Sequence, residues 1–196
     1  CLAELMRLFF SHPLWNVAET AASVLATAIQ RDPRRVAIVH ELMGDARWRV
    51  RFGAVEAAYT IAHFDRMTLF HRAVLNHFAD PNSRVRALCA ENLVSWILER
   101  TPRARARLIE EFEPQFRRWL YDDDCWVLEH VYRLLKAMAK DGIALDDFFA
   151  GGCPPLLEGL DIARFAELPR ARFLMHIEER QLARMEALKA SRSEEH

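Results

Sequence analysis

The stretch DARWRVRFGAV, residues 45–55, carries residue types whose alternation could bind a nucleic acid. Arg47, Arg49 and Arg51 alternate with Trp48 and a valine. Guanidinium groups bind phosphates, and an indole ring offers a base a surface on which to stack. The same pattern also fits an amphipathic helix, in which residues three and four apart share one face. Both interpretations stay open until the surrounding elements are known.

Metal-ligating residues are present, but their spacing is not that of a metal site. His63, Asp65, His71 and His77 are close in sequence, yet no two of them have the i, i+4 spacing of a helical metal pair. The acidic run at residues 122–124 lacks the alternate-ligand spacing of a calcium loop, and it is typical of a turn followed by a helix N-cap. We therefore predict no metal and no other cofactor.

Catalytic motifs are equally scarce. The chain contains no G-x-S-x-G, P-loop or G-x-G-x-x-G pattern. Cys125 stands at a predicted helix start, where the pKa of a thiol can be lowered, but no base lies beside it in the sequence. We predict that the protein is not an enzyme, and we name no catalytic residue.

Composition favours one globular domain without a strong overall field. The 196 residues are 52% hydrophobic and 28% charged, and the net charge is −1. Residues 31–107 have 14 basic and 8 acidic residues, net +6, whereas residues 108–196 have 12 and 18, net −6. The four cysteines form no C-x-x-C pair, which favours a reducing, cytoplasmic setting. No apolar run reaches the roughly 18 residues of a membrane span. The start in LAELMRLFF suggests a piece of a longer protein with further domains before it.

Helices are the only regular elements that the hydrophobic pattern predicts. Apolar residues recur at spacings of three and four almost throughout, and short breaks such as residues 11–13 and 79–81 separate helices of about 10 to 20 residues. Proline at a helix start, with Asp or Ser just before it, is ordinary capping chemistry. The fold class is therefore all-α.

The even spacing of the breaks indicates an internal repeat. Aligning Val50 with Val85 gives an offset of 35 residues and places DARWRVRFGAVEAAYTIA over DPNSRVRALCAENLVSWI. A further step of 42 reaches DDCWVLEHVYRLLKAMA, with Val127 in register. A step of 33 backward reaches HPLWNVAETAASVLATA, with Val17 in register. Four helices thus share one pattern, and each follows another amphipathic helix.

The motif D-x-x-x-x-V-R-x-x-A resembles that of the HEAT repeat family. The resemblance covers about residues 1–140 as four helical hairpins, at about 1–31, 32–64, 65–101 and 102–140. It implies an all-α, right-handed α-solenoid in which an Asp–Arg ladder joins neighbouring repeats. The ladder residues are Asp45, Arg51, Asp80 and Arg86. The first repeat departs from the motif with His12 and Ala18, and the fourth keeps Asp122 but has Leu128 in place of the arginine.

This resemblance changes the interpretation of the opening stretch. Arg51 becomes a structural ladder residue, and Val50 a core residue. The aromatic and apolar residues at helical spacing are expected to pack between repeats; they are Trp48, Phe52, Val55 and Tyr59. Only Arg47 and Arg49 are left without a structural role.

The resemblance also implies that the second helix of each hairpin lines a concave surface. Projecting those helices gives one polar ridge, which we expect to be exposed. Its four stripes are Asn16, Thr20, Ser23 and Thr27; Arg49, Gly53, Glu56 and Thr60; Arg84, Leu88, Glu91 and Ser95; Trp126, His130, Arg133 and Ala137. The predicted partner-binding residues are Arg49, Glu56, Arg84, Glu91, Trp126, His130 and Arg133. The alternative is a solvated face with internal Arg–Glu pairs.

The pattern changes after Lys140. Residues 141–196 predict a short helix at about 143–150, a Gly-Gly-Cys-Pro-Pro break and a helix at about 169–190 with a frayed end at SRSEEH. The apolar side of the long helix consists of Phe173, Met175, Ile177, Leu182, Met185 and Leu188. We expect this segment to cap the open end of the solenoid, the alternative being a helix for dimerisation.

Two functions follow as hypotheses. The mixed charges of the ridge favour a non-catalytic protein–protein interaction module, a scaffold or sensor arm of a larger bacterial-type protein that binds a protein or peptide on its concave face. The alternative is a nucleic-acid-binding protein similar to the HEAT-like DNA glycosylases, which the +6 segment supports. Glu56 and Glu91 on the same ridge argue against it.

Overall fold

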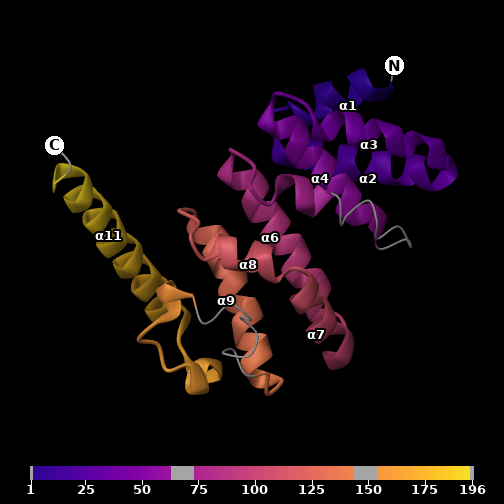
Figure 1. Cartoon of the computed structure of the whole chain (residues 1–196). Helices are drawn as coiled ribbons and strands as arrows, with labels where there is room; N and C mark the ends of the chain where they lie inside the picture. The colour runs from indigo at the N-terminus through magenta and orange to yellow at the C-terminus, as the bar shows by residue number, and fades with distance from the viewer. Residues whose placement is uncertain (1, 63–72, 144–153, 195–196) are drawn as a thin grey trace. The chain divides into compact units, whose positions relative to one another are not determined.

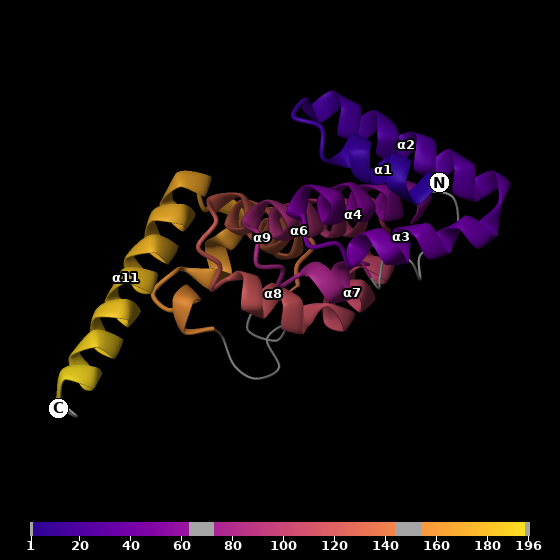
Figure 2. The ribbon, with the colours of Figure 1, turned by 90° about the horizontal axis from the view of Figure 1, so that it is seen from above.

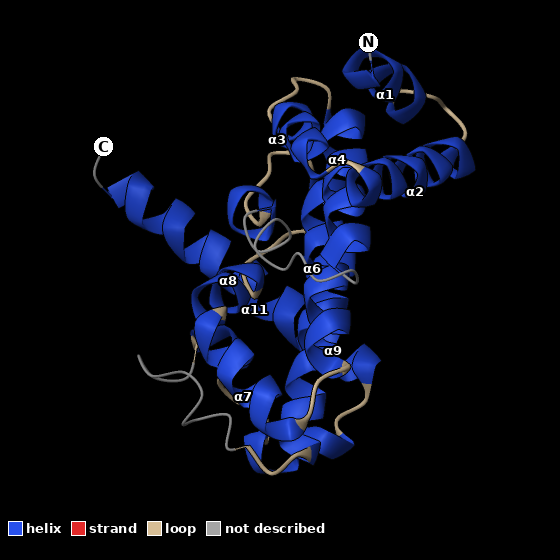
Figure 3. Ribbon diagram, turned by 90° about the vertical axis from the view of Figure 1, so that its right-hand side faces the viewer, coloured by secondary structure: helices blue, strands red, loops and turns tan. Residues whose placement is uncertain are grey.

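The computed structural model describes residues 2–62, 73–143 and 154–194. Every regular element in these ranges is a helix, which confirms the all-α class (Figure 3). The chain divides into two compact units, Cys1–Leu93 and Val94–His196, and the division falls inside one helix, α6 (Ser83–Leu98). The expected division into an array at 1–140 and a cap at 141–196 stays a prediction.

Unit 1 consists of helices that pack around α4 (Figures 1 and 2). Its elements are α1 (Leu2–Phe10), α2 (Trp15–Arg31), the 3-10 turn η1 (Pro33–Arg35), α3 (Val36–Met43), α4 (Trp48–Ala62) and the start of α6. Helices α2 and α3 both pack against α4, and α1 packs against α2. Fully buried side chains include Met6, Phe10, Leu25, Ile29 and Leu42. Val50, Phe52 and Val55 are buried as predicted.

The same turn precedes the second helix of all four aligned segments. In each case a side chain accepts a hydrogen bond from the backbone N–H two residues later, which closes a turn and fixes the helix start. The four pairs are His12 Nδ1 with Leu14 N at 3.1 Å, Asp45 Oδ1 with Arg47 N at 3.0 Å, Asp80 Oδ1 with Asn82 N at 2.9 Å, and Asp122 Oδ1 with Asp124 N at 3.0 Å. The offsets of 33, 35 and 42 residues therefore align equivalent turns.

Arg51 and Arg86 make equivalent contacts with backbone carbonyl groups. Arg51 Nη1 donates to the carbonyl oxygens of the residues six and five positions before it, both at 2.9 Å. Arg86 Nη1 donates to the carbonyl oxygens at the same two positions before it, at 2.9 and 3.4 Å. Each guanidinium thus satisfies carbonyl groups of the turn that precedes its own helix.

Arg51 also joins α4 to the turn before α6. Its Nε and Nη2 donate to the two carboxylate oxygens of Asp80 at 2.7 and 2.8 Å, and the two side chains are only 12% and 2% exposed. His77 Nδ1 lies 3.2 Å from the same carboxylate. Burial alone would raise the pKa of Asp80, but hydrogen bonds from Arg51 and His77 hold it well below its usual range.

Asp45 also receives a guanidinium group from the segment before it, but from α1 and not from the motif position on α2. Arg7 in α1 donates from Nε to Asp45 Oδ2 at 3.0 Å and also pairs with Glu4 and Glu41. The motif position for this arginine is Ala18, on the following helix. A carboxylate at Asp45 therefore receives a guanidinium from the preceding hairpin, as Asp80 does, although the sequence motif is absent. The side chain of Arg47 holds the pKa of Asp45 low, and Arg7 adds to this effect.

Helix α4 approaches α1 closely at Gly53. A Cβ atom placed on this residue would lie 2.4 Å from two ring atoms of Phe10, whose side chain is 1% exposed. The ring therefore occupies the space that any side chain at Gly53 would need. The prediction that Gly53 lies on the exposed ridge is wrong, because Phe10 covers it.

Unit 2 contains the end of α6 and the remaining helices. They are α7 (Pro102–Glu111), α8 (Glu113–Trp119), α9 (Cys125–Lys140), the 3-10 turns η2 (Pro155–Leu157) and η3 (Ile162–Glu167), and α11 (Arg170–Glu194). Asp124 caps α9 by accepting from the backbone N–H of Trp126 at 2.9 Å, which confirms the predicted turn and N-cap. The helix expected at 143–150 lies outside the described residues but for Ile143.

Helix α11 contacts the rest of unit 2 from Phe173 to Arg184. Gln181 Nε2 donates to the carbonyl of Asp122 at 2.8 Å, and Arg184 Cζ lies 4.7 Å from the centroid of the Tyr121 ring. Phe173 and Ile177 are buried, and the Phe173 ring lies 5.2 Å from that of Tyr132 in α9. The Tyr132 hydroxyl donates to the carbonyl of Leu168, just before α11, at 2.6 Å. Three other members of the predicted apolar side are more than half exposed, namely Met175, Leu182 and Met185. The helix continues to Glu194, beyond its predicted end near residue 190.

We predict that replacing Asp80 with alanine lowers the free energy of unfolding by about 3–5 kcal/mol, because it leaves the Arg51 guanidinium buried without its partner. Urea denaturation measures this. Glu167→Ala, which breaks an ion pair whose side chains are 70% and 68% exposed, serves as the control and should change nothing measurable. A loss below 1 kcal/mol for Asp80→Ala would contradict the structural role of the pair.

The pH dependence of the same pair has a definite sign. The folded pKa of Asp80 lies below its unfolded value, so its contribution is complete above about pH 4 and fades as the pH falls further. The stability difference between the wild type and Asp80→Asn should therefore shrink from pH 6 to pH 2.5. A difference that grows on acidification would contradict this assignment.

We predict that Gly53→Ala destabilises the protein by about 1–3 kcal/mol, because the new methyl group overlaps the buried Phe10 ring. Helix propensity alone would favour alanine by about 1 kcal/mol. Gly44→Ala is the matched control, since its nearest neighbouring atom lies 3.6 Å from the added Cβ. Thermal denaturation of both variants gives the comparison, and equal behaviour would contradict the close approach.

Candidate functional site

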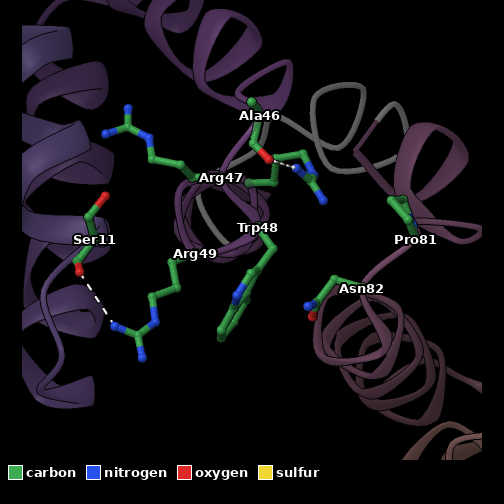
Figure 4. Close-up of a pocket in the computed structure, with 8 residues that line it drawn as sticks. Ser11, Ala46, Arg47, Trp48, Arg49, Pro81 and Asn82 are labelled. Atoms are coloured by element: carbon green, nitrogen blue, oxygen red, sulfur yellow. Dashed lines mark hydrogen bonds between the residues drawn. The ribbon is translucent and has the colours of Figure 1, made fainter.

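The RWRVR stretch lines a hollow of about 480 Å³ in unit 1 (Figure 4). Three segments form it: the turn after α1 at Ser11, the start of α4 at residues 46–51, and the turn before α6 at Pro81 and Asn82. The shared turn geometry described above places these segments, because each turn fixes where the next helix begins. The residues whose chemistry raised the question of nucleic-acid binding therefore do line a surface depression.

The arginines of this surface fall into two classes. Arg47 and Arg51 are paired with the ladder carboxylates, Arg47 with Asp45 at 2.9 Å. Arg49 and Arg84 have no carboxylate partner among the described residues. Arg49 Nη1 reaches only the backbone carbonyl of Ser11, at 3.5 Å (Figure 4). The guanidinium groups of Arg49 and Arg84 are thus left for a ligand, whereas those of Arg47 and Arg51 are paired with carboxylates within the protein.

The ring of Trp48 lies against the guanidinium groups of both Arg49 and Arg84. The Cζ atoms of Arg49 and Arg84 lie 5.4 and 5.3 Å from the centroid of its ring, within the range of a cation–π interaction. Stacking restrains the two side chains without neutralising their charge. Their donors are therefore held in place and available for an anion.

A second, smaller hollow shares Trp48 and Arg49 and extends to Trp15 and Arg84. The ring centroids of Trp15 and Phe52 lie 4.5 Å apart in an edge-on arrangement, and Trp15 is 46% exposed. Trp15 donates from its indole N–H to Glu19 at 2.7 Å. The surface therefore has two indole rings beside its guanidinium groups.

Trp15 is not among the predicted site residues, although its spacing from Trp48 is visible in the sequence. It lies 33 residues before Trp48, which is the offset of the first repeat, so the two tryptophans occupy equivalent positions. We name Trp15, Trp48, Arg49 and Arg84 the tryptophan–arginine surface.

Carboxylates lie further along the same helices. Glu56 on α4 and Glu91 on α6 occupy equivalent positions, and Glu56 accepts a hydrogen bond from Asn92 Nδ2 at 3.3 Å. Burial raises the pKa of Glu56, and the negative charges of Glu91 and Glu19 raise it further. Neither Glu56 nor Glu91 pairs with Arg49 or Arg84 in the described structure, so the internal Arg–Glu pairs of the alternative interpretation do not form.

The predicted ridge is not continuously exposed. Gly53, Leu88 and His130 are buried, and Glu56 is half-buried. The assignment of these positions to an exposed ridge is therefore wrong for the first three. The first stripe is exposed along its length, at Asn16, Thr20, Ser23 and Thr27.

Three predicted partner-binding residues belong to unit 2. Trp126 is 62% exposed and Arg133 is exposed. His130 lies beneath them, with Nδ1 3.2 Å from Arg133 Nη1. Burial, together with the charge of Arg133, lowers the pKa of His130 to about 4. The structure thus brings four of the seven predicted residues together in unit 1 and the other three in unit 2.

Within the described residues, no three His, Cys, Asp or Glu side chains gather to hold a metal ion. His63, Asp65 and His71 lie outside those residues. None of the helices described has the length and apolar character that a bilayer crossing requires. Comparison with protein-family models and with curated proteins finds no match to this chain. Its function is therefore inferred from its own residues.

We predict that His130 makes stability depend on pH. Its folded pKa of about 4 lies below the ordinary value near 6.5, so only the unfolded chain takes up this proton between the two values, and stability falls as the pH falls through that window. His130→Gln should reduce the stability lost between pH 7 and pH 5, measured by chemical denaturation. The exposed His40→Gln is the control and should keep the wild-type loss. Identical losses in all three proteins would contradict the assignment.

Proposed function

We propose that the chain is a non-catalytic interaction module that binds a polypeptide partner at the tryptophan–arginine surface. The observation that carries the proposal is the pair of guanidinium groups of Arg49 and Arg84, both stacked on Trp48 and both without a carboxylate partner among the described residues. Tryptophan and arginine are the residue types that most often contribute strongly to protein interfaces.

We further propose that the helical hairpins form a HEAT-like α-solenoid. The four equivalent turns and the two guanidinium bridges to backbone carbonyls support this assignment, because they recur at the spacing of the motif. In such an array the equivalent positions of successive repeats form rows. Rows of this kind suit an extended partner, as expected of a scaffold or sensor arm within a larger cytoplasmic protein.

A nucleic acid is the second candidate, because Arg49 and Arg84 have no carboxylate partner in the described part of the chain and Trp48 could stack on a base. Glu19, Glu56 and Glu91 weigh against it. Burial raises the pKa of Glu56, and the negative charges of Glu91 and Glu19 raise it further, so both of these carboxylates lie near Glu56. A phosphate backbone that continued along this face would meet their repulsion.

We predict that Trp48→Ala and Arg84→Glu each weaken peptide binding at least tenfold. The purified chain would select from a displayed library of random dodecapeptides, and the affinities of selected peptides would be measured by calorimetry. Arg34→Glu changes the net charge equally at an exposed position in the same unit and should leave binding unchanged. Circular dichroism confirms that each variant is folded.

Labelled single- and double-stranded oligonucleotides would be titrated in parallel at two salt concentrations. Weak oligonucleotide binding that does not respond to Arg84→Glu is expected. Oligonucleotide binding that falls steeply with salt and is lost in Arg84→Glu, in the absence of any selected peptide, would overturn the proposal in favour of nucleic-acid binding.

A further inference from the structure

Two rows of opposite charge cross the helices of unit 1. The arginine row consists of Arg49 on α4 and Arg84 on α6, and the glutamate row consists of Glu56 and Glu91 on the same helices, with Glu19 on α2 beside them. On each helix the glutamate follows the arginine by seven residues. The rows arise because the repeat offset of 35 residues separates both Arg49 from Arg84 and Glu56 from Glu91.

The spacing of the rows is set by helix geometry. Seven residues make nearly two turns, so the arginine and the glutamate of one helix share a face and lie about 10 Å apart along its axis. Direct ion pairs on a helix form at spacings of three or four residues, not seven. The two rows therefore remain separate, and neither neutralises the other.

Both rows lack counter-charges among the described residues. The arginine row contacts a backbone carbonyl and the Trp48 ring, and the glutamate row contacts Asn92 and the Trp15 indole N–H. Burial raises the pKa of Glu56, and the nearby negative charges of Glu91 and Glu19 raise it further, so negative charge gathers at this row. A bound cation would relieve this repulsion, and a bound anion would complete the arginine row.

Aromatic rings extend from the arginine end of the surface. Trp15, Phe52 and Trp48 line the smaller hollow together with both arginines. Aromatic-lined grooves bind proline-rich segments in the polyproline II conformation, because this conformation is already ordered before binding. It repeats every three residues with a rise of about 3.1 Å per residue, so side chains three apart share a face about 9 Å apart. This distance matches the separation of the rows, whereas side chains on one face of a β-strand lie about 6.6 or about 13 Å apart and match it less well.

We propose that unit 1 binds a polyproline II segment that carries an acidic and a basic side chain three residues apart, with the acidic side chain on Arg49 and Arg84 and the basic one on Glu56 and Glu91. This inference rests on the proposed function and specifies the chemistry of its partner. It excludes a uniformly acidic ligand, which the glutamate row repels, and a uniformly basic one, which the arginine row repels.

The test uses three capped nine-residue peptides, each of one Glu, one Lys and seven Pro, in which Lys follows Glu by one, three or five residues. Binding to the full chain would be measured by titration of backbone amide NMR signals. The peptide with the spacing of three should bind at least fivefold more tightly than the other two. Equal affinities would overturn the inference.

Charge-reversal variants then test which side chain of the peptide binds to each row. Arg84→Glu should weaken binding of the spacing-three peptide, and replacing the peptide's Glu with Lys should restore it. Glu91→Lys should likewise be rescued when the peptide's Lys becomes Glu. Both positions are exposed, so the fold is expected to tolerate the changes, and Arg34→Glu is the control that should need no rescue. Reversals without rescue would contradict the assignment of the rows.

The outcomes separate this inference from the proposed function. Library-selected peptides that are lost in Trp48→Ala, combined with no preference among the three spacings, would keep the interaction module and reject the bipolar segment. Binding of neither the selected nor the designed peptides would reject both.

Discussion

The buried pair of Arg51 and Asp80 is the contact on which the arrangement of unit 1 depends. Asp80 receives two hydrogen bonds from α4, one contact from His77 and one from the backbone at Asn82, so a single carboxylate fixes α4, the preceding segment and the start of α6. Because the pair is largely removed from water, the loss of either side chain would leave the other charge buried without a partner. The same contact sets the register that brings Trp48 and Arg84 together. The proposed binding surface therefore depends on the contact between α4 and the turn before α6.

Much of this could be predicted from sequence, because it depends on short-range chemistry. A carboxylate before a helix closes a turn on the N–H two residues later whatever lies beyond it, and the offset of 35 residues follows from aligning such turns. The same alignment separates the arginines into those beside an aspartate and those without one. Arg49 and Arg84 are predicted from their place on the helical projection, and their equivalence is visible in the printed sequence. The prediction that Arg47 has no structural role is wrong, because it pairs with Asp45.

The burial of individual positions could not be predicted in the same way. A helical projection assigns residues to faces but says nothing of what the neighbouring helix places opposite them. Gly53 projects onto a polar stripe, yet Phe10 covers it. His130 is buried although Trp126 and Arg133, its neighbours on the same stripe, are exposed. Arg7 shows the converse, since a contact that the motif assigns to one helix is made from another. Such features depend on contacts between residues distant in sequence, which no local pattern records.

The contact between Gly53 and Phe10 means that helices α4 and α6 are alike without being interchangeable. The position on α6 equivalent to Gly53 is Leu88, whose side chain would occupy the space of the Phe10 ring. A copy of α6 therefore could not replace α4 beside α1, even though the turns and arginine contacts would match. The shapes of the facing side chains thus restrict which helix can stand next to which, so a recombined chain would have to keep neighbours that already fit.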